Sequence, residues 1–80
     1  AYSWYSAKQL SRIFLQEEKQ EKAIKILSDT YNNLVNKEIY ETFDYAEFLK
    51  NNERFKESIK FYSEIINKIE NIRFDLQNKI

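Results

Sequence analysis

Ala7–Leu27 reads AKQLSRIFLQEEKQEKAIKIL, and Thr42–Tyr62, which begins 35 residues later, reads TFDYAEFLKNNERFKESIKFY. The two stretches carry small and large residues in the same order. The matched segments are Leu10–Phe14 with Tyr45–Leu49, and Ala23–Leu27 with Ser58–Tyr62. Apolar residues spaced three and four apart are typical of an amphipathic helix, and each stretch contains two such runs around a polar interval. The sequence therefore predicts a helix-turn-helix unit that occurs twice, and a repeat of this length indicates a stacked helical array, a short α-solenoid.

Four main helices follow from this pattern, because Gly and Pro are absent and only polar clusters interrupt the chain. We expect the helices to run over about 3–16, 20–36 and 37–50, and to resume from about residue 53. The first turn is predicted at Gln16–Gln20, which has no apolar residue to bury. The second turn is predicted at Asn51-Asn52, because Asn tolerates the left-handed conformation that ends many helices.

The C-terminal part of the chain has two interpretations, because apolar residues continue at spacings of three and four as far as Ile80. Either the fourth helix is very long, or it stops near Asn67 to Asn71 and Ile72–Ile80 begins a fifth helix. The two Asn residues favour the second interpretation, so we predict a short fifth helix. The predicted single domain, 1–80, then contains one repeat over 4–36, a second over 37–70 and a helical extension over 71–80.

The composition excludes several kinds of active site. The chain has 80 residues with no Cys and no His, so thiolate chemistry, disulfides and the commonest general base are absent. The carboxylates Glu17, Glu18, Asp44 and Glu47 stand among Lys and Gln at positions predicted to face solvent, without the burial that acid-base catalysis by a carboxyl pair needs. We therefore expect no enzyme activity, no metal site and no cofactor.

The charge balance bears on partners and location. Thirteen Lys and Arg match thirteen Asp and Glu, so no net positive charge attracts nucleic acid or an anionic membrane. The longest apolar stretches, such as Ile13–Leu15, are far shorter than the roughly 20 residues of a membrane-spanning helix. We expect a soluble protein that inserts into no membrane, and we favour the cytoplasm as its location. Because the first residue is Ala1 rather than Met, we also expect a segment of a longer polypeptide or a processed product.

The duplicated pattern resembles the tetratricopeptide repeat, a helical hairpin of roughly 34 residues with small residues where its helices cross. The resemblance covers roughly residues 4–70. Its small positions fall on Ser11, Ala23, Ala46 and Ser58. Its large positions fall on Leu10, Phe14, Leu27, Tyr45, Leu49, Phe55 and Tyr62. Helices that cross at about 8 to 10 Å need small side chains at the closest approach, so packing physics agrees with this register.

The resemblance also implies which large residues are buried and where the chain departs from the family. Phe14, Tyr45, Phe55 and Tyr62 are expected in the core. Ile59 is expected there too, so that Ile59→Ala would leave a cavity. The departures are Glu18 and Glu53 in place of the usual turn glycine, and Ala7 and Thr42 in place of Trp.

By the same resemblance, the first helix of each repeat would line a concave groove. The groove positions would be Tyr5, Lys8, Arg12, Tyr40, Phe43, Glu47 and Lys50. Aromatic anchors beside cations suit a peptide or a partner helix with acidic groups, so we expect a non-catalytic protein-protein interaction scaffold. Some members of the family clamp a C-terminal carboxylate with Lys and Asn one turn apart. Here Lys8 matches, but Arg12 takes the Asn position, and Phe43 and Glu47 break the pattern in the second repeat.

Two other functions remain as alternatives. The chain could be a structural or oligomerisation segment of a larger protein. The pentatricopeptide repeat, an RNA-binding hairpin with the same period, is a weaker alternative, because the net charge is zero and Glu47 lies at a groove position. Two repeats leave their outer faces uncovered. We therefore expect Trp4 and the Ile69–Ile80 stripe to be buried by self-association or by docking to other segments of a longer parent protein.

Overall fold

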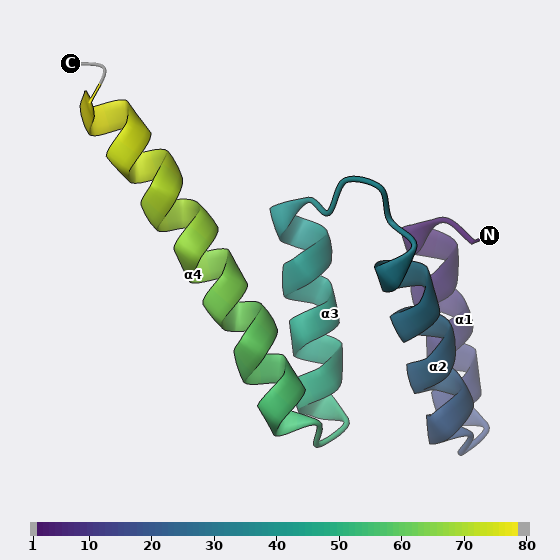
Figure 1. Ribbon diagram of the computed structural model, residues 1–80. Helices are drawn as coiled ribbons and strands as arrows, with labels where there is room; N and C mark the ends of the chain where they lie inside the picture. Colours follow the sequence, from purple (N-terminus) through teal and green to yellow (C-terminus); the bar gives the residue numbers. More distant parts are fainter. Residues whose placement is uncertain (1, 79–80) are drawn as a thin grey trace.

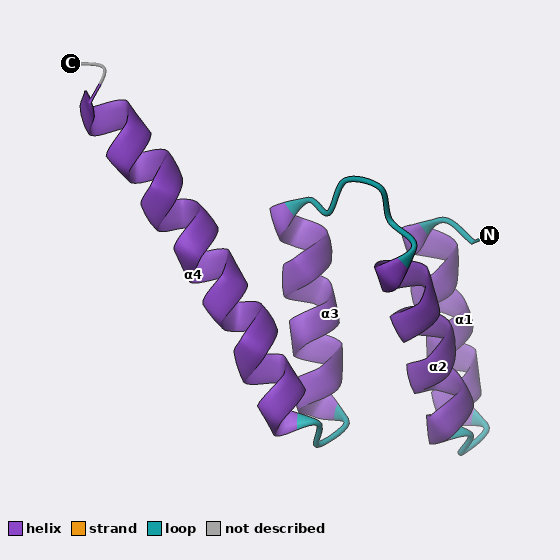
Figure 2. Ribbon diagram, in the orientation of Figure 1, coloured by secondary structure: helices purple, strands orange, loops and turns teal. Residues whose placement is uncertain are grey.

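The described part of the chain, residues 2–78 of the computed structural model, consists of helices and their connections (Figure 2). The helices are α1 (Trp4–Gln16), α2 (Gln20–Asn32), α3 (Ile39–Asn51) and α4 (Phe55–Asn78). Figure 1 shows two hairpins, α1 with α2 and α3 with α4, and the packing is most extensive within each hairpin. The predicted all-α arrangement of antiparallel hairpins is therefore confirmed, and residues 79–80 of the predicted extension lie outside the described residues.

The first hairpin turns through a left-handed residue at the end of α1. Glu18 has φ 60°. Its N–H donates to the Leu15 carbonyl at 3.0 Å, and the Lys19 N–H donates to the Phe14 carbonyl at 2.8 Å. These two bonds define a Schellman cap, a turn that satisfies the last carbonyls of a helix and usually carries Gly at its left-handed position.

The second hairpin uses the same turn 35 residues later. Glu53 has φ 64° and donates its N–H to the Lys50 carbonyl at 3.1 Å, while the Arg54 N–H reaches the Leu49 carbonyl at 2.8 Å. Asn52 stays at φ −105°, so the predicted left-handed position at Asn51-Asn52 is wrong by one residue. The reason is that Asn52 is the C-cap of α3, and the cap geometry places the left-handed conformation at the residue after the C-cap, which here is Glu53.

The left-handed glutamates predict a stabilising substitution. Glu53→Gly should raise the free energy of unfolding by about 1 kcal/mol, because a Cβ at positive φ crowds the following carbonyl and Gly has none. Glu18→Gly should have a similar effect, and chemical denaturation would measure both.

Glu53→Ala is the matched control, since it removes the carboxylate but keeps the Cβ. A gain for Glu53→Ala equal to that for Glu53→Gly would show that charge, and not backbone conformation, sets the cost at this turn.

The connection between the hairpins is longer than predicted, because α2 ends at Asn32 and not near Asn36. The Asn33 side chain donates to the Asp29 carbonyl at 2.9 Å, and this bond competes with continuation of the helix. The connection ends where the Glu38 N–H donates to the Glu41 carboxylate at 2.9 Å, which stabilises the first turn of α3.

The last helix is a single helix of 24 residues, so the predicted fifth helix is wrong. Asn67 and Asn71 are exposed and lie within α4 without interrupting it. Exposed Asn weakens a helix by only about 0.7 kcal/mol relative to Ala, and no Gly or Pro follows to break the backbone ladder. The spacing of the apolar residues was therefore the stronger signal of the two.

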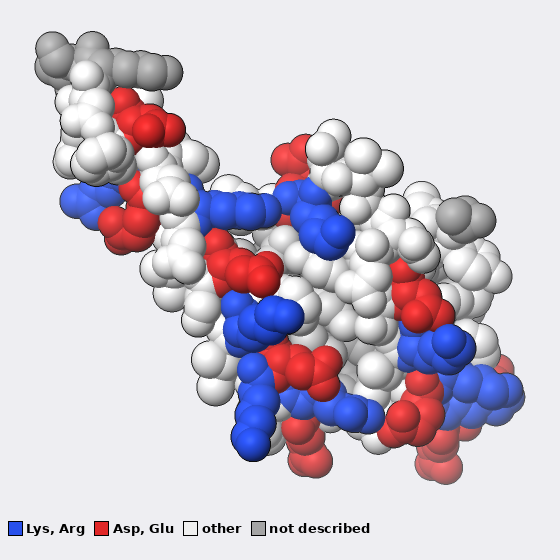
Figure 3. All heavy atoms as spheres, in the orientation of Figure 1, with Lys and Arg blue, Asp and Glu red and all other residues white. Residues whose placement is uncertain are grey.

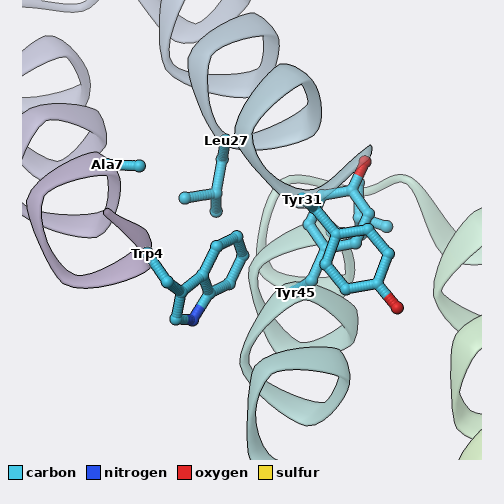
Figure 4. Packing of buried hydrophobic residues seen from close by; sticks show 6 residues of the cluster. Trp4, Ala7, Leu27, Tyr31 and Tyr45 are labelled. Carbon is cyan, nitrogen blue, oxygen red and sulfur yellow. The ribbon is translucent and has the colours of Figure 1, made fainter. Parts of the chain in front are cut away.

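The core is an aromatic cluster to which every helix contributes a ring. Trp4 from α1 meets Tyr31 from α2 and Tyr45 from α3 edge-on, with ring centroids 5.9 and 6.2 Å apart. Figure 4 shows the indole between Leu27 and the two tyrosines. Phe61 from α4 lies 5.0 Å from the Tyr45 ring. Trp4 is only 5% exposed, so the prediction that it lies on an outer face is wrong, because Tyr31 and Tyr45 cover it.

Two hydrogen bonds between side-chain hydroxyls link α2 and α3. The Tyr31 hydroxyl lies 2.8 Å from the Thr42 hydroxyl, and the Tyr45 hydroxyl donates to the Ser28 hydroxyl at 2.9 Å. Burial raises the pKa of both tyrosines, so both phenols stay neutral at ordinary pH. The hairpins are thus joined by the stacking of Tyr31 on Tyr45. Each of the two phenol hydroxyls also has a hydrogen-bond partner, a hydroxyl on the opposite helix.

The four small residues predicted at helix crossings are all buried. Ser11 and Ser58 are 2% exposed, and Ala23 and Ala46 are 0% exposed. Tyr45 is buried as predicted, while Phe14 and Tyr62 are half-buried.

Two residues predicted in the core are instead exposed. Phe55 is 56% exposed and Ile59 is 64% exposed, so both predictions are wrong. They lie in the first turns of α4, on the side where no other helix among the described residues packs. Their apolar character would suit a further helix, which residues 2–78 do not supply.

The register predicts the effect of overpacking at Ala46. Ala46→Leu should lower the free energy of unfolding by about 1 to 3 kcal/mol, because no space exists for three more carbons. Thermal denaturation followed by circular dichroism would measure it.

Ile59→Ala serves as the control, with an expected change within about 0.5 kcal/mol because the side chain is exposed. If the two substitutions had equal effects on the melting temperature, the register would be incorrect.

Candidate functional site

A hollow of about 310 Å³ lies between α1 and α3, one helix from each hairpin. Its lining residues are Lys8, Ser11, Arg12, Leu15, Leu27, Asp44, Glu47, Phe48, Asn51 and Asn52. Apolar side chains from three helices form part of the wall, and charged groups of both signs stand beside them. Such a mixture is typical of sites that bind a partner through a few polar contacts around an apolar surface.

One end of the hollow is closed by an ion pair between the two hairpins. The Lys8 ammonium lies 2.8 Å from the Asp44 carboxylate, and both side chains are 30% exposed. The same carboxylate accepts the Trp4 indole N–H at 3.2 Å. Because Asp44 already neutralises Lys8, this lysine is less available to an anionic ligand than the tetratricopeptide resemblance implies.

Arg12 is the cation that the hollow offers to a ligand. It lies one turn after Lys8 on α1, it is exposed, and no ion pair engages it within residues 2–78. A guanidinium can bind a carboxylate through two parallel hydrogen bonds, which gives both strength and orientation. Leu15 follows three residues later on the same wall, so an apolar contact is available next to the charge.

The carboxylate of Glu47 is held by two neighbours. It accepts a hydrogen bond from the Tyr62 hydroxyl of α4 and lies 2.9 Å from the Lys50 ammonium. The bonds from Tyr62 and Lys50 hold the pKa of Glu47 below its ordinary value. Desolvation and the nearby carboxylate raise the pKa of Tyr62, and Glu47 raises the pKa of Lys50. Glu47 is therefore a charged wall residue bound to its own neighbours.

The structure brings together only some of the predicted groove residues. Lys8, Arg12 and Glu47 line the hollow. Lys50 lies outside it and pairs with Glu47, and Phe43 packs edge-on against Tyr62 with ring centroids 6.1 Å apart.

The two remaining tyrosines of the predicted set also lie outside the hollow. Tyr5 is 68% exposed and Tyr40 is 62% exposed. Both are open to solvent, and no ring contact involves either of them within the described residues.

Sequence reasoning missed several residues of the wall. Asp44, Phe48 and Asn51 line the hollow, and each follows the previous one by three or four residues on α3. That spacing was a usable signal, since Asp44 lies three residues before Glu47 and must share its face. Asn52 belongs to the turn, and its side chain accepts a bond from Gln20 at 3.2 Å, which no sequence pattern indicates.

No group of three or more acidic residues in residues 2–78 could hold a metal ion. Glu17 pairs with Lys19 at 3.1 Å in the exposed first turn. No helix in the same range is long and apolar enough to cross a membrane.

Comparison with known proteins gives no matching family model, no matching curated protein and no matching solved structure. The tetratricopeptide resemblance therefore stays a prediction that rests on residue spacing.

The neighbours of Glu47 predict a measurable shift in its titration. In the wild-type protein the carboxyl should titrate below about pH 4.5, and Tyr62→Phe should move the midpoint upward because a bond to the charged form is lost. Since the pKa is lowered in the folded state, this carboxylate stabilises the fold above about pH 4.5 and the contribution disappears as the pH falls through the lowered pKa. Carbon NMR of the carboxyl group would follow the titration.

Tyr5→Phe is the control, because Tyr5 is exposed and lies outside the hollow. An unchanged Glu47 midpoint in Tyr62→Phe would contradict the assigned hydrogen bond.

Proposed function

We propose that the chain is a non-catalytic protein-interaction module that binds a peptide or a partner helix in the hollow between α1 and α3. The observation that supports this function is a cation, Arg12, that no ion pair engages within the described residues and that lies beside an apolar wall of Leu15, Leu27 and Phe48. A pocket that combines an apolar surface with a directional charge favours a ligand that has a charged side chain next to an apolar one over a simple ion.

The chemistry of the ligand follows from the groups that remain available. Arg12 would bind a carboxylate, and the neighbouring wall would accept an aliphatic or aromatic side chain. Lys8 contributes little attraction because Asp44 neutralises it at 2.8 Å. We therefore expect a short segment with an acidic residue next to a large apolar residue.

The distribution of charge supports a protein ligand over RNA. The charged side chains that line the hollow are two cations, Lys8 and Arg12, and two carboxylates, Asp44 and Glu47, so the lining has no net positive charge to attract a phosphate backbone. Over the face seen in Figure 3, blue and red side chains are interspersed and no continuous basic stripe is present. A helical repeat that binds RNA has to neutralise the phosphate charges, and such a stripe would be required for that.

Peptide selection on the full chain tests this function. Selection from displayed random peptides of about ten residues should enrich segments with an acidic residue beside an apolar one. Arg12→Glu should weaken binding of the selected peptides by about tenfold or more, because two charged hydrogen bonds are replaced by repulsion. Isothermal calorimetry with synthetic peptides would measure the loss.

Lys22→Glu is the matched control, since it makes the same charge change on the exposed face of α2. Amide chemical shifts should locate the peptide at Arg12, Phe48 and Asn51. Binding that survives Arg12→Glu unchanged, or shifts confined to other surfaces, would contradict the proposed site.

A further inference from the structure

The face of α4 that packs into the protein continues beyond the place where the packing ends. Ile65 is 8% exposed, whereas Ile69, Ile72 and Leu76 are 50%, 52% and 61% exposed. At 3.6 residues per turn, these four residues lie on one side of the helix. Figure 1 shows the C-terminal end of α4 projecting past the end of α3, away from the other helices of the described residues. The three exposed residues of this face are called the α4 stripe below.

The length of α4 explains why the stripe is uncovered. Twenty-four residues make a helix of about 36 Å, whereas the 13 residues of α3 span only about 20 Å. Ile65, Ile69, Ile72 and Leu76 follow one another at intervals of four, three and four residues. This is the spacing at which two helices interlock side chains along a seam.

We infer that the α4 stripe pairs with the α4 stripe of a second copy of this chain, with the two helices antiparallel. This dimer goes beyond the proposed function, because it uses a surface outside the hollow. In the symmetric register, Ile69 of each copy packs against Ile72 of the other. Leu76 then lies over Ile66 and the exposed edge of Ile65.

Charges beside the stripe favour a second copy as the partner. Lys68 and Asp75 stand on the same flank of the seam, immediately before Ile69 and Leu76. Flanking positions of this type face each other in an antiparallel pair. Lys68 of each copy would therefore lie beside Asp75 of the other, which gives two opposite-charge pairs per dimer.

The other flank is also compatible with the antiparallel pair. There Ile66 of one copy meets Arg73 of the other, whose aliphatic stem can cover an apolar side chain while its charge stays in water. In a parallel pair, by contrast, Lys68 would face Arg73 and two cations would repel. The charge pattern thus selects one orientation.

The contacts of Lys68 within one copy allow this pairing. Its ammonium donates to the Lys37 carbonyl at 3.1 Å. An ammonium has three N–H donors, so two remain for a carboxylate. The seam is short, and interfaces of this size belong to the weak class, so we expect dissociation in the micromolar range or above.

Sedimentation of the full chain across about 1 to 500 μM tests the dimer, a range chosen for a weak interface. Ile72→Glu should abolish dimer formation at every concentration. Phe74→Glu is the matched control, because Phe74 is 63% exposed but lies on the opposite side of α4 from the stripe. It should leave the dissociation constant within about twofold. Circular dichroism should show unchanged helix content in both variants.

A charge exchange tests the partner and the register together. Lys68→Glu and Asp75→Lys should each weaken the homodimer by about tenfold or more, because each creates two like-charge pairs. An equimolar mixture of the two variants should form a heterodimer, since every facing pair then has opposite charges. The double variant Lys68→Glu/Asp75→Lys should recover the homodimer even though it also lacks the bond to the Lys37 carbonyl.

Several results would overturn the inference. If the wild-type chain stayed monomeric throughout the concentration range, the stripe would not pair with a second copy and would have to bind another partner. Equal effects of Ile72→Glu and Phe74→Glu would place the contact elsewhere on α4. A double variant no better than the single variants would exclude the antiparallel register. Peptide binding in the hollow should be unaffected by Ile72→Glu, so failure of the dimer and failure of the proposed function are distinguishable.

Discussion

The stacking of Tyr31 on Tyr45 is the contact on which the arrangement of the two hairpins depends. The ring centroids lie 4.5 Å apart at an angle of 23°, and each ring belongs to a different hairpin. Contacts between α2 and α3 are otherwise sparse compared with those inside each hairpin. Because neither hairpin is large enough to bury its own apolar side, the stack and the rings around it unite two marginal units into one core.

The same junction determines the shape of the candidate site. The walls of the hollow come from α1 and α3, which are in different hairpins, so its width follows the angle at which the hairpins dock. Asp44 links that angle to the site, because it holds both the core residue Trp4 and the wall residue Lys8. The stacked tyrosines therefore influence the shape of the hollow without lining it.

Residue spacing predicted the parts of the structure that depend on local periodicity. Ser11 and Ala46 are buried as predicted, because three- and four-residue spacing is a property of one helix and identifies the face it buries. Trp4 was misplaced because its burial depends on two tyrosines from other helices, which periodicity cannot locate. At the site, the predicted register named Lys8 and Arg12, which both line the hollow, yet it could not show that Asp44 pairs with only the first of them.

The single tryptophan has a further consequence for how this protein can be observed. Trp4 is the chain's only indole, and it contacts one tyrosine from each hairpin at centroid distances of 5.9 and 6.2 Å. Its fluorescence therefore arises entirely from the junction, and neighbouring phenols at this range transfer excitation to it efficiently. Separation of the two hairpins would expose the indole to water and lengthen its distance to Tyr45, the tyrosine of the other hairpin, while its distance to Tyr31 within its own hairpin would stay as an internal reference. The emission of Trp4 therefore reports directly on the docking of one hairpin against the other.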